Sequence, residues 1–266
     1  MSSVRVGLCI ASLLLPLTAC EESPTGRKQL TLVPNQQMAE IGSRTFAEML
    51  RTGPLVEDQR VLDYVGCVTR ALVDVPPEPQ GEWSVAVFRD PTPNAFALPG
   101  GNVAINLGML GVARTPDQLA AVIGHEIGHV LADHSNERLT QELAVQGGLM
   151  LVDLLAEQPG SAGHVALRKA LGLGAQFGVL LPYSRTHETE ADLIGLELMA
   201  RAGFDPMASL DLWRNMAAAG GGQPLEFLST HPSHESRLDG LEAGMEAALA
   251  LQRQALAQGR RPPCGA

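Results

Sequence analysis

The chain has 266 residues, 45% of them hydrophobic, so it is long enough for one medium-sized domain with a real core. Aromatic residues make up only 4% of the chain, and the core must therefore rely on aliphatic side chains. The formal net charge of −10 argues against nucleic acid as a partner.

The first residues have the pattern of an export signal. Arg5 precedes an apolar run from Val6 to Leu17, which is too short to span a bilayer comfortably. The sequence Leu17-Thr18-Ala19-Cys20 then resembles a bacterial lipobox, in which the chain is cut before the cysteine and its sulfur is lipidated. An ordinary secretory signal with an incidental cysteine is the alternative. We therefore expect a signal peptide at 1–19, a polar tether at 20–34 and one domain at 35–266.

Two cysteines remain for the mature domain. Cys9 would leave with the signal and Cys20 would carry lipid, so Cys67 and Cys264 remain in an oxidising compartment. We expect them to form a disulfide that pins the C-terminal tail to an early helix. A count of two free thiols in the unreduced protein would rule this out.

The hydrophobic patterns predict a mostly helical α+β fold with a small sheet. Strand-like alternation occurs at 83–88, 94–98 and 102–106. Apolar residues from about 143 to 181 are interrupted by polar ones and predict two helices, not a membrane span. Other helices are expected at about 35–51, 57–73, from Thr115 onward, after Ser184 to Arg201, and at 233–257.

The helix expected after Thr115 has clear start signals. Thr115 can cap it, Pro116 suits its first turn, and Gln118 completes a capping-box spacing. Gly124 and Gly128 each cost about 1 kcal/mol relative to alanine inside a helix. Their presence indicates that another element approaches this helix closely.

An HExxH motif lies within this helix. Side chains four residues apart share one helix face, so His125 and His129 can bind one metal ion. Glu126 can reach a water molecule at that ion, which is the arrangement of a zinc hydrolase. The motif also occurs by chance in about one chain in a hundred of this length. A matching third ligand downstream makes coincidence a poor explanation.

A third metal ligand is expected from the helix that follows Ser184. Glu188 is the best candidate, because Asp192 lies one turn further and can orient a ligand imidazole, that of His125, by accepting a hydrogen bond. His187 is the rival ligand, but it has no such companion. Glu190 points elsewhere and is expected to be solvated or structural.

Glu126 is the expected general base, which passes a proton to the leaving amine. The negative charge that develops on the substrate needs positive partners, for which His231 and Arg237 are the candidates. A helix start with incidental polar residues is the alternative for this segment. The remaining histidines are expected at the surface or in caps: His134, His164 and His234.

With the HExxH motif, the ExxxD of the second helix and Thr230-His231-Pro232 in this order, the chain resembles the zinc metallopeptidase family of CAAX prenyl proteases, HtpX and Oma-type enzymes. It looks closest to the bacterial periplasmic lipoprotein members. The resemblance extends from the stretch TGRKQL at 25–30 to Arg237. It implies a zincin-like (gluzincin) domain with a small sheet beside the active-site helix.

The resemblance also implies roles for individual residues. One Zn²⁺ per chain would be held by His125, His129 and Glu188, with Glu126 as the base and Asp192 as the final aspartate of the motif. His231 would be a gate close to the zinc or an oxyanion donor. A cleft strand that binds extended peptides by strand addition would begin at Asn94, Ala95 and Phe96.

We therefore interpret the chain as a membrane-anchored, extracytoplasmic zinc metalloendopeptidase. Its partners would be extended or misfolded envelope polypeptides, and its lipid anchor would place it at the outer membrane, facing the periplasm. We expect neither CAAX processing, because there is no transmembrane bundle, nor a tetratricopeptide-repeat domain after Arg237. The alternative is a chaperone-like protein with structural zinc, which would have no need of Glu126 beside an open coordination position.

Overall fold

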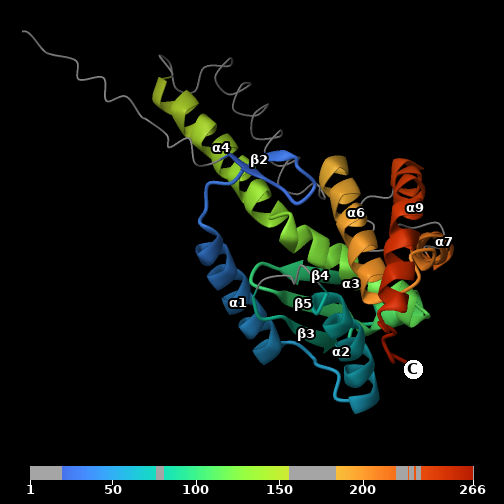
Figure 1. Cartoon of the computed structure of the whole chain (residues 1–266). Coiled ribbons are helices and arrows are strands. Elements are labelled where there is room, and N and C mark those ends of the chain that lie inside the picture. The colour runs from blue at the N-terminus through green and yellow to red at the C-terminus, as the bar shows by residue number, and fades with distance from the viewer. Residues whose placement is uncertain are drawn as a thin grey trace, which may run out of the picture.

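The computed structural model describes residues 20–75, 81–155, 184–219, 227, 231 and 235–265. The signal peptide expected at 1–19, His164, His234 and residues 156–181 of the apolar stretch lie outside these residues. The elements follow in chain order (Figure 1): β1 Cys20–Glu22, β2 Lys28–Leu30, α1 Asn35–Thr52, α2 Gln59–Val73, β3 Ser84–Phe88, β4 Ala95–Leu98, β5 Asn102–Asn106, the 3₁₀ helix η2 Leu107–Gly111, α3 Pro116–Leu131, α4 His134–Leu155, α6 Arg185–Ala202, α7 Ala208–Ala219 and α9 Glu235–Ala257.

A three-stranded sheet lies near the centre of the fold, in the order β3-β5-β4. β5 pairs in parallel with β3 and antiparallel with β4, so that Val103 lies opposite Val85 on one side and Ala97 on the other. β4 is therefore an edge strand of this sheet. The predicted α+β fold with a small sheet is confirmed.

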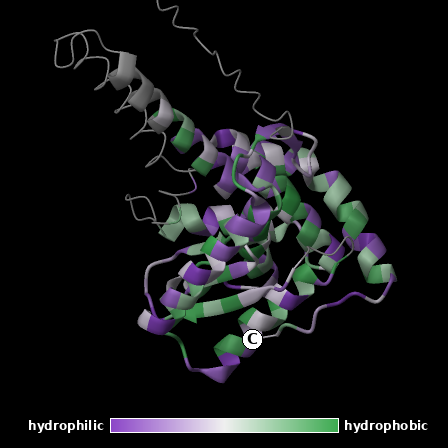
Figure 2. Cartoon of the chain, turned by 90° about the vertical axis from the view of Figure 1, so that its left-hand side faces the viewer, coloured by the Kyte–Doolittle hydropathy of each residue, from purple (hydrophilic) through white to green (hydrophobic). Residues whose placement is uncertain are grey.

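Helices cover both faces of the sheet. The side chains of β5 alternate, so Val103 and Ile105 join the main core with α2 and α3, whereas Ala104 packs with Phe46 of α1. Figure 2 shows the sheet as largely green, hydrophobic strands between helices that mix green and purple residues. No helix among the described residues is both long and apolar enough to cross a membrane.

The HExxH helix α3 packs closely against α6. A Cβ atom on Gly128 would lie 2.7 Å from the carbonyl oxygen of Ala191, and one on Gly124 would lie 3.0 Å from that of Gly195. The close approach predicted from these two glycines is therefore confirmed. It brings the histidine face of α3 next to the acidic first turns of α6.

The predicted caps of these helices are present, with one difference. The hydroxyl of Thr115 accepts a hydrogen bond from the amide of Gln118, and that of Ser184 accepts one from the amide of His187. Gly203 ends α6 at a φ of 94°, a backbone conformation that favours glycine. The side chain of Gln118, however, accepts a hydrogen bond from the amide of Arg114, one residue before the capping position.

α4 begins at His134, earlier than the helix predicted from Leu143. Asp133 separates it from α3 with a φ of 53°, a left-handed conformation that aspartate adopts more readily than most residues. The sequence pattern missed this start because the first turns of α4 bury polar side chains, such as those of Asn136 and Thr140, instead of apolar ones.

Both ends of the described part of the chain are attached to the domain. β1 and β2 form an antiparallel hairpin within the segment predicted as a tether, and the amide of Leu32 donates to the hydroxyl of Thr140 in α4. Near the other end, Cys264 forms a disulfide with Cys67 of α2, across a sequence separation of 197 residues. This is the pairing hypothesised from the cysteine count.

Candidate active site

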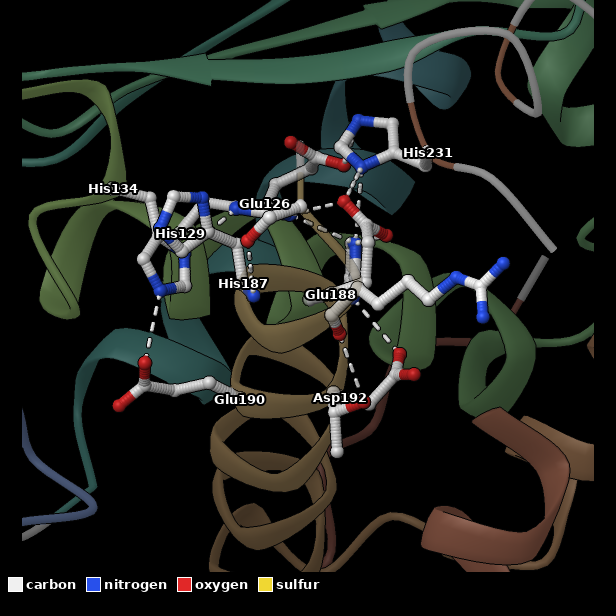
Figure 3. Close-up of polar contacts among 12 residues, drawn as sticks. Glu126, His129, His134, His187, Glu188, Glu190, Asp192 and His231 are labelled. Atoms are coloured by element: carbon white, nitrogen blue, oxygen red, sulfur yellow. Dashed lines mark hydrogen bonds and ion pairs between the residues drawn. The ribbon is translucent and has the colours of Figure 1, made fainter. Parts of the chain in front are cut away.

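Three side chains converge between α3 and α6 (Figure 3). The Nε2 atoms of His125 and His129 lie 3.1 Å apart, and each lies 3.4 Å from a carboxylate oxygen of Glu188. All three side chains are buried, and Glu188 is fully inaccessible. The structure thus brings together the three residues predicted to bind metal.

The hydrogen bonds of the two rings fix where their lone pairs point. Nδ1 of His125 lies 2.9 Å from the carboxylate of Asp192, so this nitrogen carries the proton and donates it. Nδ1 of His129 is likewise engaged, 2.9 Å from the ring of His134. In the neutral tautomers that these bonds favour, both Nε2 atoms are acceptors that face each other and a carboxylate. Such an arrangement is repulsive unless a cation lies between them, and two imidazoles with one carboxylate suit Zn²⁺.

Asp192 is itself held by Arg237. Nε and Nη2 of Arg237 each donate to one Asp192 oxygen at 2.6 Å, and the guanidinium lies over the ring of Trp213 at 4.2 Å. Burial alone would raise the pKa of Asp192, but Arg237 and the His125 hydrogen bond lower it. Asp192 therefore stays an anion that can orient His125, as the sequence predicted.

Arg237 differs from its predicted role as a partner of the substrate oxyanion. Its third nitrogen, Nη1, lies 2.6 Å from Glu188, and only 2% of the side chain is exposed. Because two buried carboxylates already hold the guanidinium, the structure makes Arg237 an organiser of the ligand shell. The sequence could not show this, since Arg237 follows Asp192 by 45 residues.

Glu126 lies beside the three ligands with a buried carboxylate. Its Oε1 atom has no hydrogen-bond partner within the described part of the chain and lies 3.5 Å from Nε2 of His231. Burial raises the pKa of Glu126, although His231 and His125 act in the opposite direction. A carboxylate whose pKa is raised toward neutrality is suited to accept and return a proton.

His231 completes a group of four possible metal donors with His125, His129 and Glu188, all buried and within 4.8 Å of one another. Its Nδ1 atom lies 3.2 Å from Nε2 of His125 and 3.1 Å from Glu188, and its ring stacks on Phe227. A catalytic zinc keeps one position for water. The ring of His231 lies where a fourth protein donor would bind the metal.

Three polar residues behind the metal ligands are buried. His134, which was expected at the surface or in a cap, has an exposed fraction of 0%, so that prediction was wrong. Glu190, which was expected to be solvated or structural, is only 4% exposed and is therefore not solvated. His187, the rival metal ligand, directs Nε2 toward Glu137 at 3.0 Å and lies outside the four-donor group. The sequence missed this burial because the β1–β2 hairpin covers the helix faces on which these residues lie.

The predicted substrate strand lies next to the base. β4 is the sheet edge, and Glu126 accepts a backbone hydrogen bond from Ala97. Asn94 precedes β4 and pairs through its carbonyl with the amide of Asn106, while Ala95 is buried and Phe96 is half-buried. A groove of about 1130 Å³ runs between α1 and the turn at 99–101 and reaches His129. The free edge of β4 and this groove therefore both border the HExxH helix α3.

This geometry is that of a zincin-type metallopeptidase, and comparison with known families agrees. Residues 57–244 match the model of peptidase family M48. The chain belongs to this family, whose members use zinc, and the buried cluster of His125, His129 and Glu188 fits that metal.

Several curated proteins are similar to this chain. The mitochondrial metalloendopeptidase OMA1 of Schizosaccharomyces pombe is 42% identical over 67% of this chain and 51% of its own length. The human mitochondrial metalloendopeptidase OMA1 is 32% identical over 88% and 48%, respectively. The beta-barrel assembly-enhancing protease of Escherichia coli is 30% identical over 78% and 43%. The chain thus spans about half the length of these relatives.

Proposed function

We propose that this protein is a zinc metalloendopeptidase. The observation that carries the proposal is the convergence of the Nε2 atoms of two histidines and one carboxylate, with a second carboxylate, that of Glu126, beside them. A purely structural metal site has no need of this second carboxylate. The names of the relatives, which are metalloendopeptidases and a protease, support the same conclusion.

Different residues of the chain would have different roles in peptide hydrolysis. When bound, Zn²⁺ would polarise the scissile carbonyl and acidify an attacking water molecule. Glu126 accepts the proton of that water and delivers it to the leaving amine. Asp192 and Arg237 keep His125 in the tautomer that binds metal. His231, the fourth buried donor, would have to move aside to admit water and substrate.

The substrate would be an extended polypeptide. β4 has one edge that pairs with no other described strand, and this edge runs past Glu126. A peptide that adds to it gains main-chain hydrogen bonds, which carry affinity with modest sequence selectivity. Unfolded or misfolded chains expose such segments, so quality control of envelope proteins is the role we infer.

Replacement of Glu126 by glutamine tests the enzymatic proposal. The amide would keep the shape of the side chain but could not accept a proton, so casein cleavage should fall by about 100-fold or more. Zinc content, measured by metal analysis, should remain one ion per chain. The control is the exposed exchange Glu48→Gln, which should leave both measurements unchanged. Equal digestion of casein by Glu126→Gln and the unaltered protein would refute the proposal.

We also propose that the protein is anchored in the bacterial cell envelope through a lipid on Cys20. The lipobox resemblance of residues 17–20 supports the anchor, and the Escherichia coli relative supports the envelope, since its printed name refers to beta-barrel assembly. The mitochondrial relatives show that the same domain also works in another compartment. The outer membrane, facing the periplasm, is the location we favour.

The anchor is tested by replacement of Cys20 with alanine. The exchange should abolish labelling by a fatty-acid probe and leave an uncut precursor, which migrates more slowly on a gel. Cys67→Ala, which removes a cysteine of the folded domain, is the control and should still be labelled. Unchanged labelling of Cys20→Ala would refute the lipobox assignment.

A chaperone-like binding protein is the second candidate, and one observation favours it. His231 adds a fourth donor, and four protein donors around zinc are typical of structural sites. Such a protein would suppress aggregation of an unfolded client without cutting it. Catalytic turnover of casein that a chelator abolishes and zinc restores would exclude this candidate.

A further inference from the structure

A second buried polar cluster lies behind His129, on the side away from Glu188. Nδ1 of His134 is 2.9 Å from Nδ1 of His129, and Nε2 of His134 is 3.1 Å from Oε2 of Glu190 (Figure 3). The ring of His134 also stacks on His187 at 4.3 Å.

The partners of His134 determine where its proton lies. Glu190 is a carboxylate, so Nε2 of His134 carries the proton and donates it to Glu190. Nδ1 of His134 is then an acceptor, and it accepts a hydrogen bond from Nδ1 of His129. As a result, Nε2 of His129 presents its lone pair to the metal position. Glu190 thus acts on the metal ligand through one intervening histidine.

Glu190 is held in place by the β1–β2 hairpin. Its Oε1 atom accepts hydrogen bonds from the hydroxyls of Ser23 and Thr25, and its Oε2 atom accepts one from Nε of Arg27 at 2.7 Å. The turn of the hairpin therefore encloses a carboxylate of α6.

Arg27 connects this carboxylate to α4. Its Nη1 and Nη2 atoms lie 3.0 and 2.7 Å from the two oxygens of Glu137, while Nε is bound to Glu190. Glu137 in turn accepts a hydrogen bond from His187, the stacking partner of His134. A guanidinium can hold two carboxylates in fixed directions because its donors lie in one rigid plane. The Arg27 side chain thus holds two carboxylates in place: that of Glu190, which binds His134, and that of Glu137, which binds His187.

We propose that Arg27 is a positioning residue of the zinc site. Through Glu190 and His134 it holds His129 in the tautomer and orientation that bind the metal, so the hairpin next to Cys20 belongs to the metal centre. This inference rests on the proposed metal site but not on peptide cleavage. It also means that the segment proposed to lead to the membrane anchor is coupled to a metal ligand.

The affinity for zinc tests the proposal in the full chain that carries Glu126→Gln. This background separates the measurement from catalysis and prevents self-digestion. Arg27→Ala should weaken zinc binding about 10-fold, as loss of a group that orients a metal ligand does. Arg51→Ala, which removes an exposed arginine paired with Glu48, is the matched control and should bind zinc normally. Affinity is measured by competition with a chromogenic chelator.

A double-mutant cycle separates positioning from general stability. His134→Phe keeps a flat ring against His187 but removes both nitrogens of the relay. Arg27→Ala should then weaken zinc binding no further, because Arg27 acts through His134. In the Co²⁺-substituted protein, each single variant should shift the visible ligand-field bands, which a loss of stability alone would not do.

Three results would overturn the proposal. In the first, Arg27→Ala binds zinc as tightly as the Glu126→Gln background does. In the second, Arg27→Ala weakens zinc binding by the same factor with and without His134→Phe. In the third, the Co²⁺ bands of the single variants do not shift. If Arg27→Ala fails to fold in a thermal melt, Arg27→Lys decides: lysine keeps the charge but cannot hold both carboxylates, so weaker zinc binding is expected and unchanged binding refutes the proposal. If Arg27→Ala weakens zinc binding as expected but the unaltered protein does not cut casein, only the peptidase proposal is refuted.

Discussion

At the scale of single residues, each of the two histidines predicted to bind metal uses its Nδ1 atom for a hydrogen bond to another buried side chain. Asp192 holds His125, and His134 holds His129, so both metal-facing nitrogens are set by neighbours. The sequence predicted the first of these partners because Asp192 lies one helical turn after Glu188. It missed the second, since His134 lies beyond the end of α3, at the start of α4, and is held there by Glu190 of α6. Helix geometry fixes spacing within one element only.

The pairing of Asp192 with His125 gives a prediction at this scale. Asp192→Asn keeps the size of the side chain but loses the charge that Arg237 and His125 share, so zinc affinity should fall about 10-fold. Asp211→Asn, an exposed exchange beside Arg214, is the control. Chelator competition measures both. Equal zinc affinities of the two variants would show that Asp192 does not orient the ligand.

At the scale of elements, the contact of α3 with α6 creates the site. The caps at Thr115 and Ser184, the small sheet and the glycine face of α3 were all predictable, because each depends on neighbouring residues or on one repeating pattern. The β1–β2 hairpin was not predictable from composition. Its residues are polar and resemble a linker, but they pair with buried acids from α4 and α6.

The glycine face makes a prediction about stability. Gly128→Ala would place a methyl group 2.7 Å from the backbone of Ala191 and should lower the free energy of unfolding by about 1–3 kcal/mol. Gly147→Ala on α4, where nothing lies within 4 Å, should be neutral or raise it by up to about 1 kcal/mol. Denaturant unfolding measures both variants. If both exchanges stabilise the protein equally, α3 and α6 do not approach each other as closely at Gly128 as the structure shows.

At the scale of the whole molecule, both ends of the described chain return to the domain that holds the site. The disulfide fixes Cys264 to α2, and the hairpin places Arg27 against α4 and α6 (Figure 1). The cysteine count indicated the first attachment, whereas no local pattern indicated the second. The short segment that begins at the proposed anchor, Cys20, therefore also contacts buried residues beside the proposed metal centre.

The most direct test of the account is to locate zinc in crystals of the protein by anomalous diffraction on both sides of the zinc absorption edge. We predict one peak per chain, about 2.0–2.2 Å from Nε2 of His125, from Nε2 of His129 and from a carboxylate oxygen of Glu188. A peak at any other place, or none in crystals saturated with zinc, would contradict the account.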